Sequence, residues 1–588
     1  MTTHLLALSI GPVQEFIAAA RRTRDLWFGS NLLSEISKAT AKVVSDQGGL
    51  IFPAPSAAAD LAPGSELNVA NIILAELEGP DPKTVAQSAK AAAQTRWRQY
   101  ADQVFNDHQS VIRPDIWDDQ VGDVIEFYAA WVSYTPKTYR ADRARLMRLL
   151  AGRKSCRDFL PANGRAGVPK SSLDGLRESV LKDPRVEPWP EPSRRRLRVR
   201  EGEQLDVVGM VKRTAAGNRS YPSVARVAAD PWIRGVGAGN LAGLIAACKQ
   251  LGGEAIHPLN TSAERGHPQY AAFPFEGTAV FRSRYYEFRE EVGLSENDLR
   301  PLSDALRSLT RESGDPNPYL AVLVADGDRM GQALSQLSSA DEHRKFSQKL
   351  SRFAGEAWQI VQKHQGVLVY SGGDDVLAFV PVDQCLVCAR VLHERFGQLL
   401  QDWSVKTGTN LTLSVGLSIA HFMENLEDLL DYGRAAEKHA KNPRPEDKGQ
   451  EARNGFAVHL HKRGGGPITG RGNWADDLDR RLAELAAHLN GGAVPSRVAF
   501  DLHQVAQVYD GWPAESVAQA IQRDTLRVLA GKQPRQGSAL NWIHELICAR
   551  VTDAASLRKL GDELLVARQI AVAVRQASGQ PAVEEGSA

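Results

Sequence analysis

The chain has 588 residues, a formal net charge of +1, and the hydrophobic (43%) and charged (24%) fractions of an ordinary globular protein. At about 100–200 residues per domain, this length predicts roughly three to five domains. The near-zero net charge gives no global argument for a polyanionic partner. Of the five cysteines only Cys385 and Cys388 are close in sequence, so neither a disulfide framework nor a four-ligand zinc site is expected. No apolar run approaches the ~20 residues of a membrane span, and we expect a cytoplasmic protein without membrane contact.

The N-terminal residues predict a small α/β unit. His4 to Ile10 has the character of a buried strand, helical spacing runs from Val13 to Ile36 with a break at Gly29-Ser30, and residues 49–53 form a short strand. The pattern from Thr84 to Leu150 is mainly helical. Its three tryptophans are expected in the core: Trp97, Trp117 and Trp131.

Two basic segments follow. Seven lysines and arginines lie between Arg140 and Arg157, and five arginines lie within Arg194–Arg200, after a proline-rich linker at residues 188–192. Each segment is either a solvated face with local ion pairs or a contact for a phosphate backbone, and the sequence leaves both interpretations open.

From Tyr319 onward the pattern predicts strands and helices in the order β-α-β-β-α-β, which is the ferredoxin-like plan. The strands are expected at residues 320–325, 367–370, 375–380 and 411–420, and the helices at about 346–360, 384–401 and 426–441. Gly464 to Pro467 is interpreted as a flexible linker. The residues from Trp474 to about Gln576 are helical by periodicity.

Two acidic clusters occupy defined places on this plan. Asp326-Gly327-Asp328 ends the first strand, and Ser371-Gly372-Gly373-Asp374-Asp375 forms the hairpin between the next two. These strands can lie side by side in a ferredoxin-like sheet, which would place up to four carboxylates within a few ångströms. Taken alone, Gly-Gly-Asp-Asp could be only a tight turn. The joint pattern favours a metal site, because an apolar strand has no structural need to end in an acid.

Clustered carboxylates repel one another unless a divalent cation neutralises them, and oxygen-only ligands favour Mg²⁺ or Mn²⁺ over zinc. We predict Asp326, Asp374 and Asp375 as metal ligands, with Asp328 as a further catalytic acid. Two such cations can activate a ribose hydroxyl and stabilise the departing pyrophosphate. The candidate nucleotide-binding residues are the small residues beside the acids and one lysine at the end of the last helix: Gly327, Ser371, Gly372, Gly373 and Lys441.

These segments resemble a known family. Ala325 to Gly331 (ADGDRMG) and Ser371 to Asp375 (SGGDD) look like the two signatures of the active palm domain in the large subunit of type III CRISPR effector complexes. Ala440-Lys441 and Arg453-Asn454 look like later elements of the same palm. Ser9 to Leu33 (SIGPVQEFIAAARRTRDLWFGSNLL) is similar to the opening of the family's first, degenerate palm in the Cmr branch, type III-B. Three further segments look like Cmr-branch sequence: residues 150–159, 170–180 and 205–213.

The resemblance implies an α+β multidomain chain with two ferredoxin-like palm domains, a mostly helical middle domain and a C-terminal helical bundle. The expected boundaries are 1–150 for the first palm with a helical insertion, 151–312 for the middle domain, 313–463 for the catalytic palm and 464–588 for the bundle. The resemblance also implies polymerisation of ATP into cyclic oligoadenylates. The implied partners are other effector subunits, with guide CRISPR RNA and an activating target RNA bound through the complex.

The sequence departs from the family pattern at three points. The first palm has Gly11 and a short apolar strand where catalytic acids could stand. None of the fourteen histidines is followed by Asp, so no HD nuclease centre is expected. Residues 170–175 (KSSLDG) occupy the place where some relatives hold zinc, so no zinc is expected.

Two other functions compete with this interpretation. A diguanylate-cyclase-like enzyme would use the same fold and metals, but its signature usually reads Gly-Gly-Asp/Glu-Glu-Phe, whereas Val376 follows Asp375 here. A mainly structural scaffold of the guide-RNA complex would be expected to have lost the acids, and all four are present.

Overall fold

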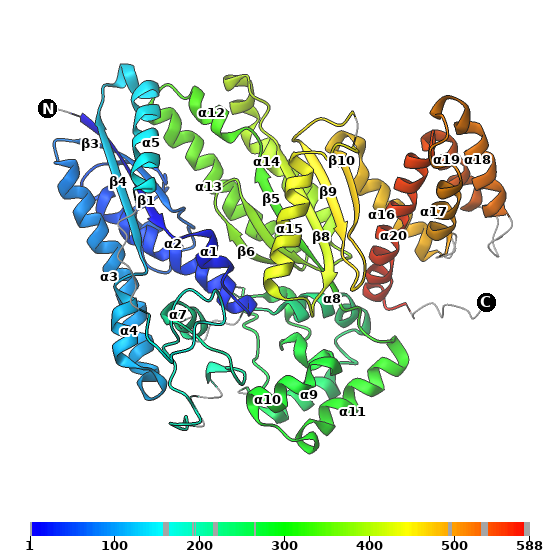
Figure 1. Ribbon diagram of the computed structural model, residues 1–588, viewed down its shortest axis with the longest axis horizontal. Coiled ribbons are helices and arrows are strands. Elements are labelled where there is room, and N and C mark those ends of the chain that lie inside the picture. Colours follow the sequence, from blue (N-terminus) through cyan, green and yellow to red (C-terminus); the bar gives the residue numbers. More distant parts are fainter. Residues whose placement is uncertain are drawn as a thin grey trace.

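The computed structural model describes residues 3–156, 164–190, 193, 196–215, 221–253, 255–263, 266–447, 449–491, 497–530 and 539–580. Within these residues the chain is a multidomain α+β protein with two β-sheets, as expected from the sequence (Figure 1). Parts of the two basic segments, namely Arg157 and Arg194-Arg195, lie outside the described residues, as does Phe159 at the end of one Cmr-like segment.

The N-terminal sheet has four strands in the order β2-β3-β1-β4, and all neighbouring strands are antiparallel. Its central strand β1 is buried along most of its length, which explains its apolar sequence. Helices α2 and α3 pack together on one face, and α5 covers the other face. The elements in chain order are β1 (Thr3–Gly11), α1 (Gln14–Ala18), α2 (Thr23–Ser45), β2 (Gly49–Phe52), β3 (Ile72–Glu78), α3 (Pro82–His108), α4 (Pro114–Val121), β4 (Glu126–Ser133) and α5 (Tyr139–Ser155).

Two expectations for this region are wrong. Helix α2 continues through Gly29, and the glycine there leaves room for Lys212, whose Cε lies 2.8 Å from the position that a Cβ would take. Residues 126–133 form strand β4 rather than helix, with side chains alternating between the two faces. Trp131 therefore points outward and is 40% exposed, whereas Trp97 and Trp117 are buried as predicted.

The second sheet has six strands in the order β10-β9-β8-β5-β7-β6. The four strands β8-β5-β7-β6 follow the ferredoxin-like plan, and β9 joins β8 in parallel. Helices α13 and α14 pack on one face, while α15 and the middle region cover the other. The elements are β5 (Tyr319–Gly327), α12 (Met330–Gln336), α13 (Ala340–Lys363), β6 (Val367–Ser371), β7 (Val376–Val380), α14 (Cys385–Thr407), β8 (Leu413–His421), α15 (Leu426–Lys441), β9 (Gly455–Leu460) and β10 (Ile468–Asn473).

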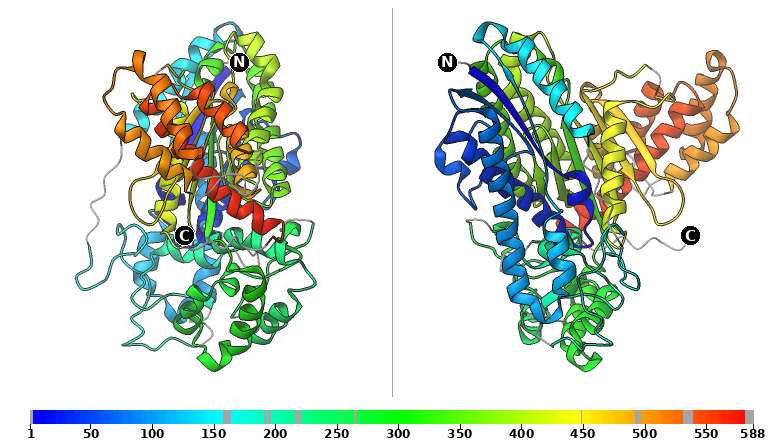
Figure 2. Two further views of the ribbon diagram at one scale, coloured as in Figure 1. Left: turned by 90° about the vertical axis from the view of Figure 1, so that its right-hand side faces the viewer. Right: turned by 60° about the vertical axis from the view of Figure 1, so that its left-hand side comes forward.

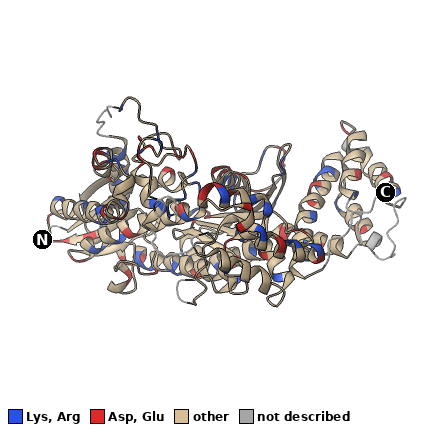
Figure 3. Ribbon diagram, turned by 90° about the horizontal axis from the view of Figure 1, so that it is seen from below, with Lys and Arg blue, Asp and Glu red and all other residues tan. Residues whose placement is uncertain are grey.

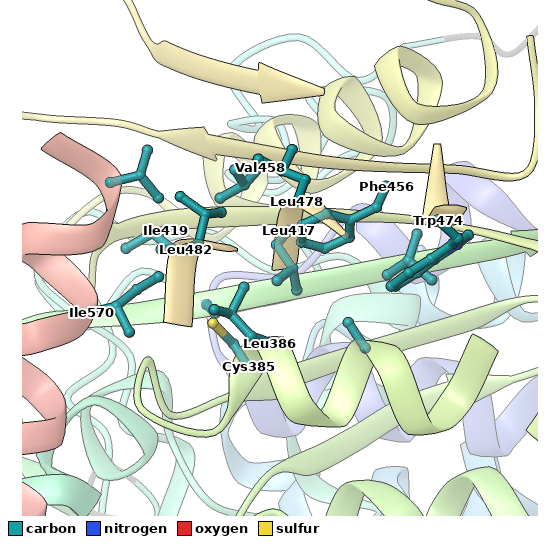
Figure 4. Packing of buried hydrophobic residues seen from close by; sticks show 14 of the residues in the cluster. Cys385, Leu386, Leu417, Ile419, Phe456, Val458, Trp474, Leu478, Leu482 and Ile570 are labelled. Atoms are coloured by element: carbon teal, nitrogen blue, oxygen red, sulfur yellow. The ribbon is translucent and has the colours of Figure 1, made fainter. Parts of the chain in front are cut away.

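The loop at residues 464–467 joins β9 to β10 as an antiparallel hairpin, so it lies within the second sheet and does not separate two domains. The C-terminal helices share a core with this sheet. In Figure 4, Leu482 and Ile570 from these helices lie against Ile419 of β8 and Val458 of β9. The C-terminal helices are α16 (Leu478–Asn490), α17 (Val498–Val508), α18 (Ala514–Ala530), α19 (Ala539–Arg550) and α20 (Ala554–Ala577).

The middle region is helical and lies below both sheets in Figure 1. Helix α8 carries its hydrophobic side against the second sheet and against α20. The helices of this region are α7 (Val207–Thr214), α8 (Val224–Val236), α9 (Ala242–Leu251), α10 (Tyr285–Val292) and α11 (Glu296–Ser313).

The two sheet domains touch directly, and Figure 2 shows them side by side. Arg344 of α13 donates from Nε to the carbonyl oxygen of Leu50 at 2.8 Å and pairs through Nη2 with Glu76 at 2.9 Å. Tyr139 of α5 shares a 2.8 Å hydrogen bond with His343. These polar contacts between the two domains fix the orientation of α13, the helix that packs behind the acidic hairpin.

Basic and acidic residues are interspersed along the chain in Figure 3, in keeping with the net charge of +1. Within the described residues, no helix is long and apolar enough to cross a membrane.

Candidate active site

The register of the second sheet brings the two acidic clusters together. Ala325 of β5 pairs with Val376, the first residue of β7, so Asp326 lies beside the end of the hairpin that carries Asp374 and Asp375. The hairpin is closed by a 3.0 Å hydrogen bond from the Gly372 amide to the carbonyl oxygen of Asp375. Strand pairing alone thus explains why acids about 50 residues apart converge.

Three carboxylates form one cluster. Asp326, Asp374 and Asp375 each offer an oxygen atom, and these oxygens lie within 4.8 Å of one another. Burial and the neighbouring Asp375 raise the pKa of Asp374 to about 7, and burial also raises the pKa of Asp375. A bound divalent cation would stabilise the ionised forms, so the site fits Mg²⁺ or Mn²⁺. Among the described residues this is the only group of three His, Cys, Asp or Glu side chains with metal-binding geometry.

The small residues around the acids are required by packing. A Cβ at Gly327 would lie 2.8 Å from the Cβ of Asp374, so glycine lets the hairpin approach β5. Gly373 has a φ of 103°, which L side chains rarely adopt, and a Cβ at Gly372 would overlap the Tyr370 ring. Ser371 is fully buried, and its hydroxyl has no hydrogen-bond partner among the described residues. Nucleotide binding by these residues stays a prediction.

Asp328 does not belong to the three-carboxylate cluster. Its side chain is fully buried and accepts hydrogen bonds from the hydroxyls of Thr412 (2.7 Å) and Ser414 (2.8 Å). The backbone amide of Asn454 donates to it at 2.9 Å, and a guanidinium nitrogen of Arg453 lies 3.7 Å away. In this position Asp328 ties the end of β5 to β8 and to the segment before β9. The catalytic role expected for it stays a prediction.

Two glycines bring α15 close to the site. A Cβ at Gly416 of β8 would overlap the backbone of Glu437, and a Cβ at Gly455 of β9 would overlap the carbonyl group of Ala440. The last turns of α15 therefore lie directly on the sheet. This close approach carries Lys441 to the acids, where its ammonium pairs with the carboxylate of Asp326. Burial and Arg453 lower the pKa of Lys441 to about 8.

Glu437 is a site residue that sequence reasoning missed. It precedes Lys441 by one helical turn, and its Oε1 lies 3.5 Å from the lysine ammonium. Burial and the charges of Asp375 and Asp328 raise the pKa of Glu437 to about 7. The sequence feature that could have identified Glu437 is its i, i+4 spacing from Lys441, which places both side chains on the same side of α15.

The remaining candidate for metal chemistry, Cys385 with Cys388, lies elsewhere. Both thiols are buried on α14 within the core of the second sheet, and Figure 4 shows Cys385 among apolar side chains. Burial raises the pKa of both thiols. They pack as small apolar residues, as expected from the sequence.

Metal affinity at this site should depend on pH. The pKa of Asp374 is about 7 in the folded protein against an ordinary 3.8. Without metal, the folded state therefore binds the carboxyl proton of Asp374 more tightly than the unfolded state does. The free energy of unfolding consequently falls as pH rises from about 4 to about 7. A cation must displace the proton, so we expect Mn²⁺ to bind about tenfold more tightly at pH 8 than at pH 6. Calorimetric titration at the two pH values measures this difference, and Asp374→Asn should abolish it. Equal affinities at both pH values would contradict the assignment.

The strand order and the acidic hairpin define a palm domain of the nucleotidyl cyclase-like class. Comparison with known proteins agrees with this. Residues 319–450 match the family described as "Cas10/Cmr2, second palm domain", and residues 5–102 match "CRISPR-associated protein Cmr2, N-terminal". The two matched segments are therefore similar to the Cas10/Cmr2 family, as the sequence motifs predict.

A curated relative is similar to the chain over part of its length. The chain is 27% identical over 299 residues to the CRISPR system Cmr subunit Cmr2 of Pyrococcus furiosus. The match covers 44% of this chain and 32% of the relative, so it spans about a third of the curated protein.

Two solved structures share the fold. A type III-B Cmr-beta cryo-EM structure in the apo state gives a TM-score of 0.60 at 13% identity, covering 91% of this chain and 78% of that one. The type III-B Cmr-beta structure bound to cognate target RNA gives a TM-score of 0.59 at 14% identity, with 89% and 78% coverage.

Proposed function

We propose that this chain is the catalytic subunit of a type III-B CRISPR effector complex and makes cyclic oligoadenylates from ATP when the complex binds target RNA. The observation that carries the proposal is the convergence of Asp326, Asp374 and Asp375 in a Cas10/Cmr2 palm. Other effector subunits, guide RNA and target RNA are the proposed partners. The domain boundaries expected from the sequence remain part of this proposal, with β10 added to the catalytic palm.

In the proposed reaction the 3′- or 2′-hydroxyl of one adenylate attacks the α-phosphate of an ATP. A new phosphodiester bond forms, the attacking hydroxyl releases its proton to water, the bond between the α- and β-phosphates breaks, and pyrophosphate leaves with its electron pair. Divalent cations held by the three aspartates would lower the pKa of the hydroxyl and neutralise the leaving group. Asp326 and the hairpin acids orient these groups from two adjacent strands. The Lys441 ammonium is placed to leave Asp326 and pair with a terminal phosphate. Glu437 holds that ammonium at the site.

The deciding experiment supplies the assembled, target-RNA-bound complex with ATP or with GTP and identifies the products by mass spectrometry. Cyclic oligoadenylates from ATP support the proposal. A cyclic dinucleotide made only from GTP would assign the chain to the diguanylate-cyclase class, and no product from either nucleotide would favour the scaffold role. The isolated chain should be much less active than the RNA-bound complex, because the first palm and the partners would hold the second nucleotide.

Lys441→Ala should raise the apparent KM for ATP by about tenfold or more, with metal binding retained. The reason is the loss of a charge-assisted contact to a phosphate, which contributes about 1.5–3 kcal/mol. Initial rates over a range of ATP concentrations measure the effect. Lys438→Ala is the matched control, because Lys438 lies on the same helix but is exposed. Unchanged kinetics at low ATP would mean that Lys441 only balances the charge of Asp326.

A further inference from the structure

The last turn of α15, which carries Lys441, is bound by a buried arginine from β10, a strand that the sequence did not predict. Arg471 of β10 is only 1% exposed. Its Nη2 donates to the carbonyl oxygen of Ala440 at 3.1 Å and also to the carbonyl oxygen of Glu451. Its Nη1 donates to Oε1 of Gln450 at 2.7 Å. One guanidinium therefore joins the end of the helix to the segment that returns from it toward β9.

This guanidinium is buried without a carboxylate partner. Among the described residues it forms no ion pair, and burial lowers the pKa of Arg471, which the charges of Asp447 and Asp476 offset only in part. Burying a cation in this way is costly, and a neutral donor could satisfy a single carbonyl group at less cost. An arginine is favoured where one planar group must reach several oxygens at fixed angles. The contacts therefore indicate a need for fixed geometry at the end of α15 rather than for charge balance.

Arg471 is itself held firmly in place. It lies opposite Ala457 in the pairing of β10 with β9. Its carbonyl oxygen accepts a hydrogen bond from Nε2 of Gln450 at 3.2 Å and one from Nζ of Lys559 on α20 at 3.4 Å. A residue that positions another must have a fixed position of its own, and these contacts meet that condition.

The backbone is bound on both sides of Lys441. Ala440, whose carbonyl group Arg471 binds, directly precedes it, and the carbonyl oxygen of Lys441 accepts from the Arg453 amide at 2.6 Å. Arg453 and Asn454 have left-handed φ values of 69° and 48°, which cost non-glycine residues energy and persist only where the surroundings enforce them. The end of α15 is thus held at a defined place, from which the Lys441 side chain reaches Asp326.

We propose that Arg471 is a positioning residue of the nucleotide site: it fixes the last turn of α15 so that the Lys441 ammonium stays beside Asp326 and within reach of a bound triphosphate. The inference rests on the proposed function, because it assigns a role at the same site. Arg471 acts through the backbone of α15. Its removal loosens that turn, and a displaced ammonium binds the phosphates less well, because such contacts are sensitive to shifts of about 1 Å.

The test measures binding of a nonreactive nucleotide to the assembled, target-RNA-bound complex. The probe is α,β-methylene-ATP, in which the bond that the proposed reaction breaks is replaced, and equilibrium dialysis in Mn²⁺ gives its Kd. Arg471→Met should raise this Kd by about fivefold, less than the loss of the Lys441 ammonium itself. Arg471→Lys should raise it by only about twofold, because lysine keeps the charge and can donate to one of the carbonyl groups.

A double-mutant cycle separates positioning from a merely structural role. If Arg471 acts through Lys441, then Arg471→Met should raise the Kd of Lys441→Ala by less than about twofold. An equal effect in both backgrounds would show that Arg471 supports only the fold, and the proposal would be wrong. Initial rates give a second readout: the KM for ATP should rise in Arg471→Met while kcat changes by less than about twofold.

Arg481→Met is the matched control. Arg481 of α16 is also buried, but it pairs with Glu563 of α20 and makes no contact with α15 among the described residues, so the Kd should stay unchanged. Thermal unfolding checks that each variant is folded. Should Arg471→Met fail to fold, Gln450→Ala, which keeps the arginine and removes its side-chain partner, must raise the Kd by about twofold or more.

The same measurements distinguish failure of this inference from failure of the proposed function. If the unmodified complex binds the probe and folded Arg471→Met binds it equally well, the inference is wrong and the proposed function stands. If the unmodified complex does not bind the probe, the proposed function fails, and the role of Arg471 fails with it.

Discussion

Replacing Asp374 and Asp375 together by alanine should reduce product formation from ATP by about a thousandfold or more in the RNA-bound complex. The two side chains supply two of the three carboxylates that can hold a cation. Loss of metal assistance costs several kcal/mol of transition-state stabilisation, and each 1.4 kcal/mol is about a factor of ten in rate. Product formation is followed by chromatography or mass spectrometry.

The same double variant should fold and assemble normally. Burial raises the pKa values of both acids, and the charge of Asp375 adds to the shift at Asp374, so removing them relieves an unfavourable interaction. Its unfolding temperature without metal should equal or exceed that of the unmodified chain. Asp402→Ala is the control, because Asp402 is an exposed acid on α14. Undiminished product formation in the double variant would rule out the metal site.

Asp328→Ala should destabilise the fold by about 3–5 kcal/mol, the range measured when one member of a buried charged network is removed. The substitution leaves the hydroxyls of Thr412 and Ser414 and the amide of Asn454 without their acceptor. Each buried group left unsatisfied costs about 1–3 kcal/mol. Chemical denaturation followed by circular dichroism measures the change, and exposed Asp431→Ala on α15 should have little effect.

This variant also separates two roles for Asp328. If Asp328→Ala unfolds at the same denaturant concentration as the unmodified chain yet loses activity, the residue acts in catalysis, as its position in the Asp-Gly-Asp motif predicts. If stability falls and Mn²⁺ still binds to the folded fraction, Asp328 is a structural residue that anchors β5.

Local sequence patterns were sufficient to predict the secondary structure of the second palm from β5 to α15, including its acidic hairpin, but not strand β10. Apolar runs bounded by Gly-Asp motifs are local signals, and each strand from β5 to β8 is found within a few residues of its expected position. The same signals predicted that Asp326 and the hairpin acids converge, because strand adjacency in this topology follows from element order. The family resemblance rested on the same short motifs.

Other features depend on contacts between distant segments, and these became visible only in the folded chain. Asp328 follows Asp326 by two residues, and side chains two apart on a strand point to the same face. Strand β5 ends at Gly327, however, so this rule does not extend to Asp328, and its side chain does not join that of Asp326. Beyond that point the contacts of Thr412, Ser414 and Asn454 set its direction. Strand β4 was missed because only Tyr128, Ala130 and Val132 of its residues are buried, which weakens its apolar pattern. The position of Lys441 likewise depends on Gly416 and Gly455, whose missing side chains let α15 lie on the sheet.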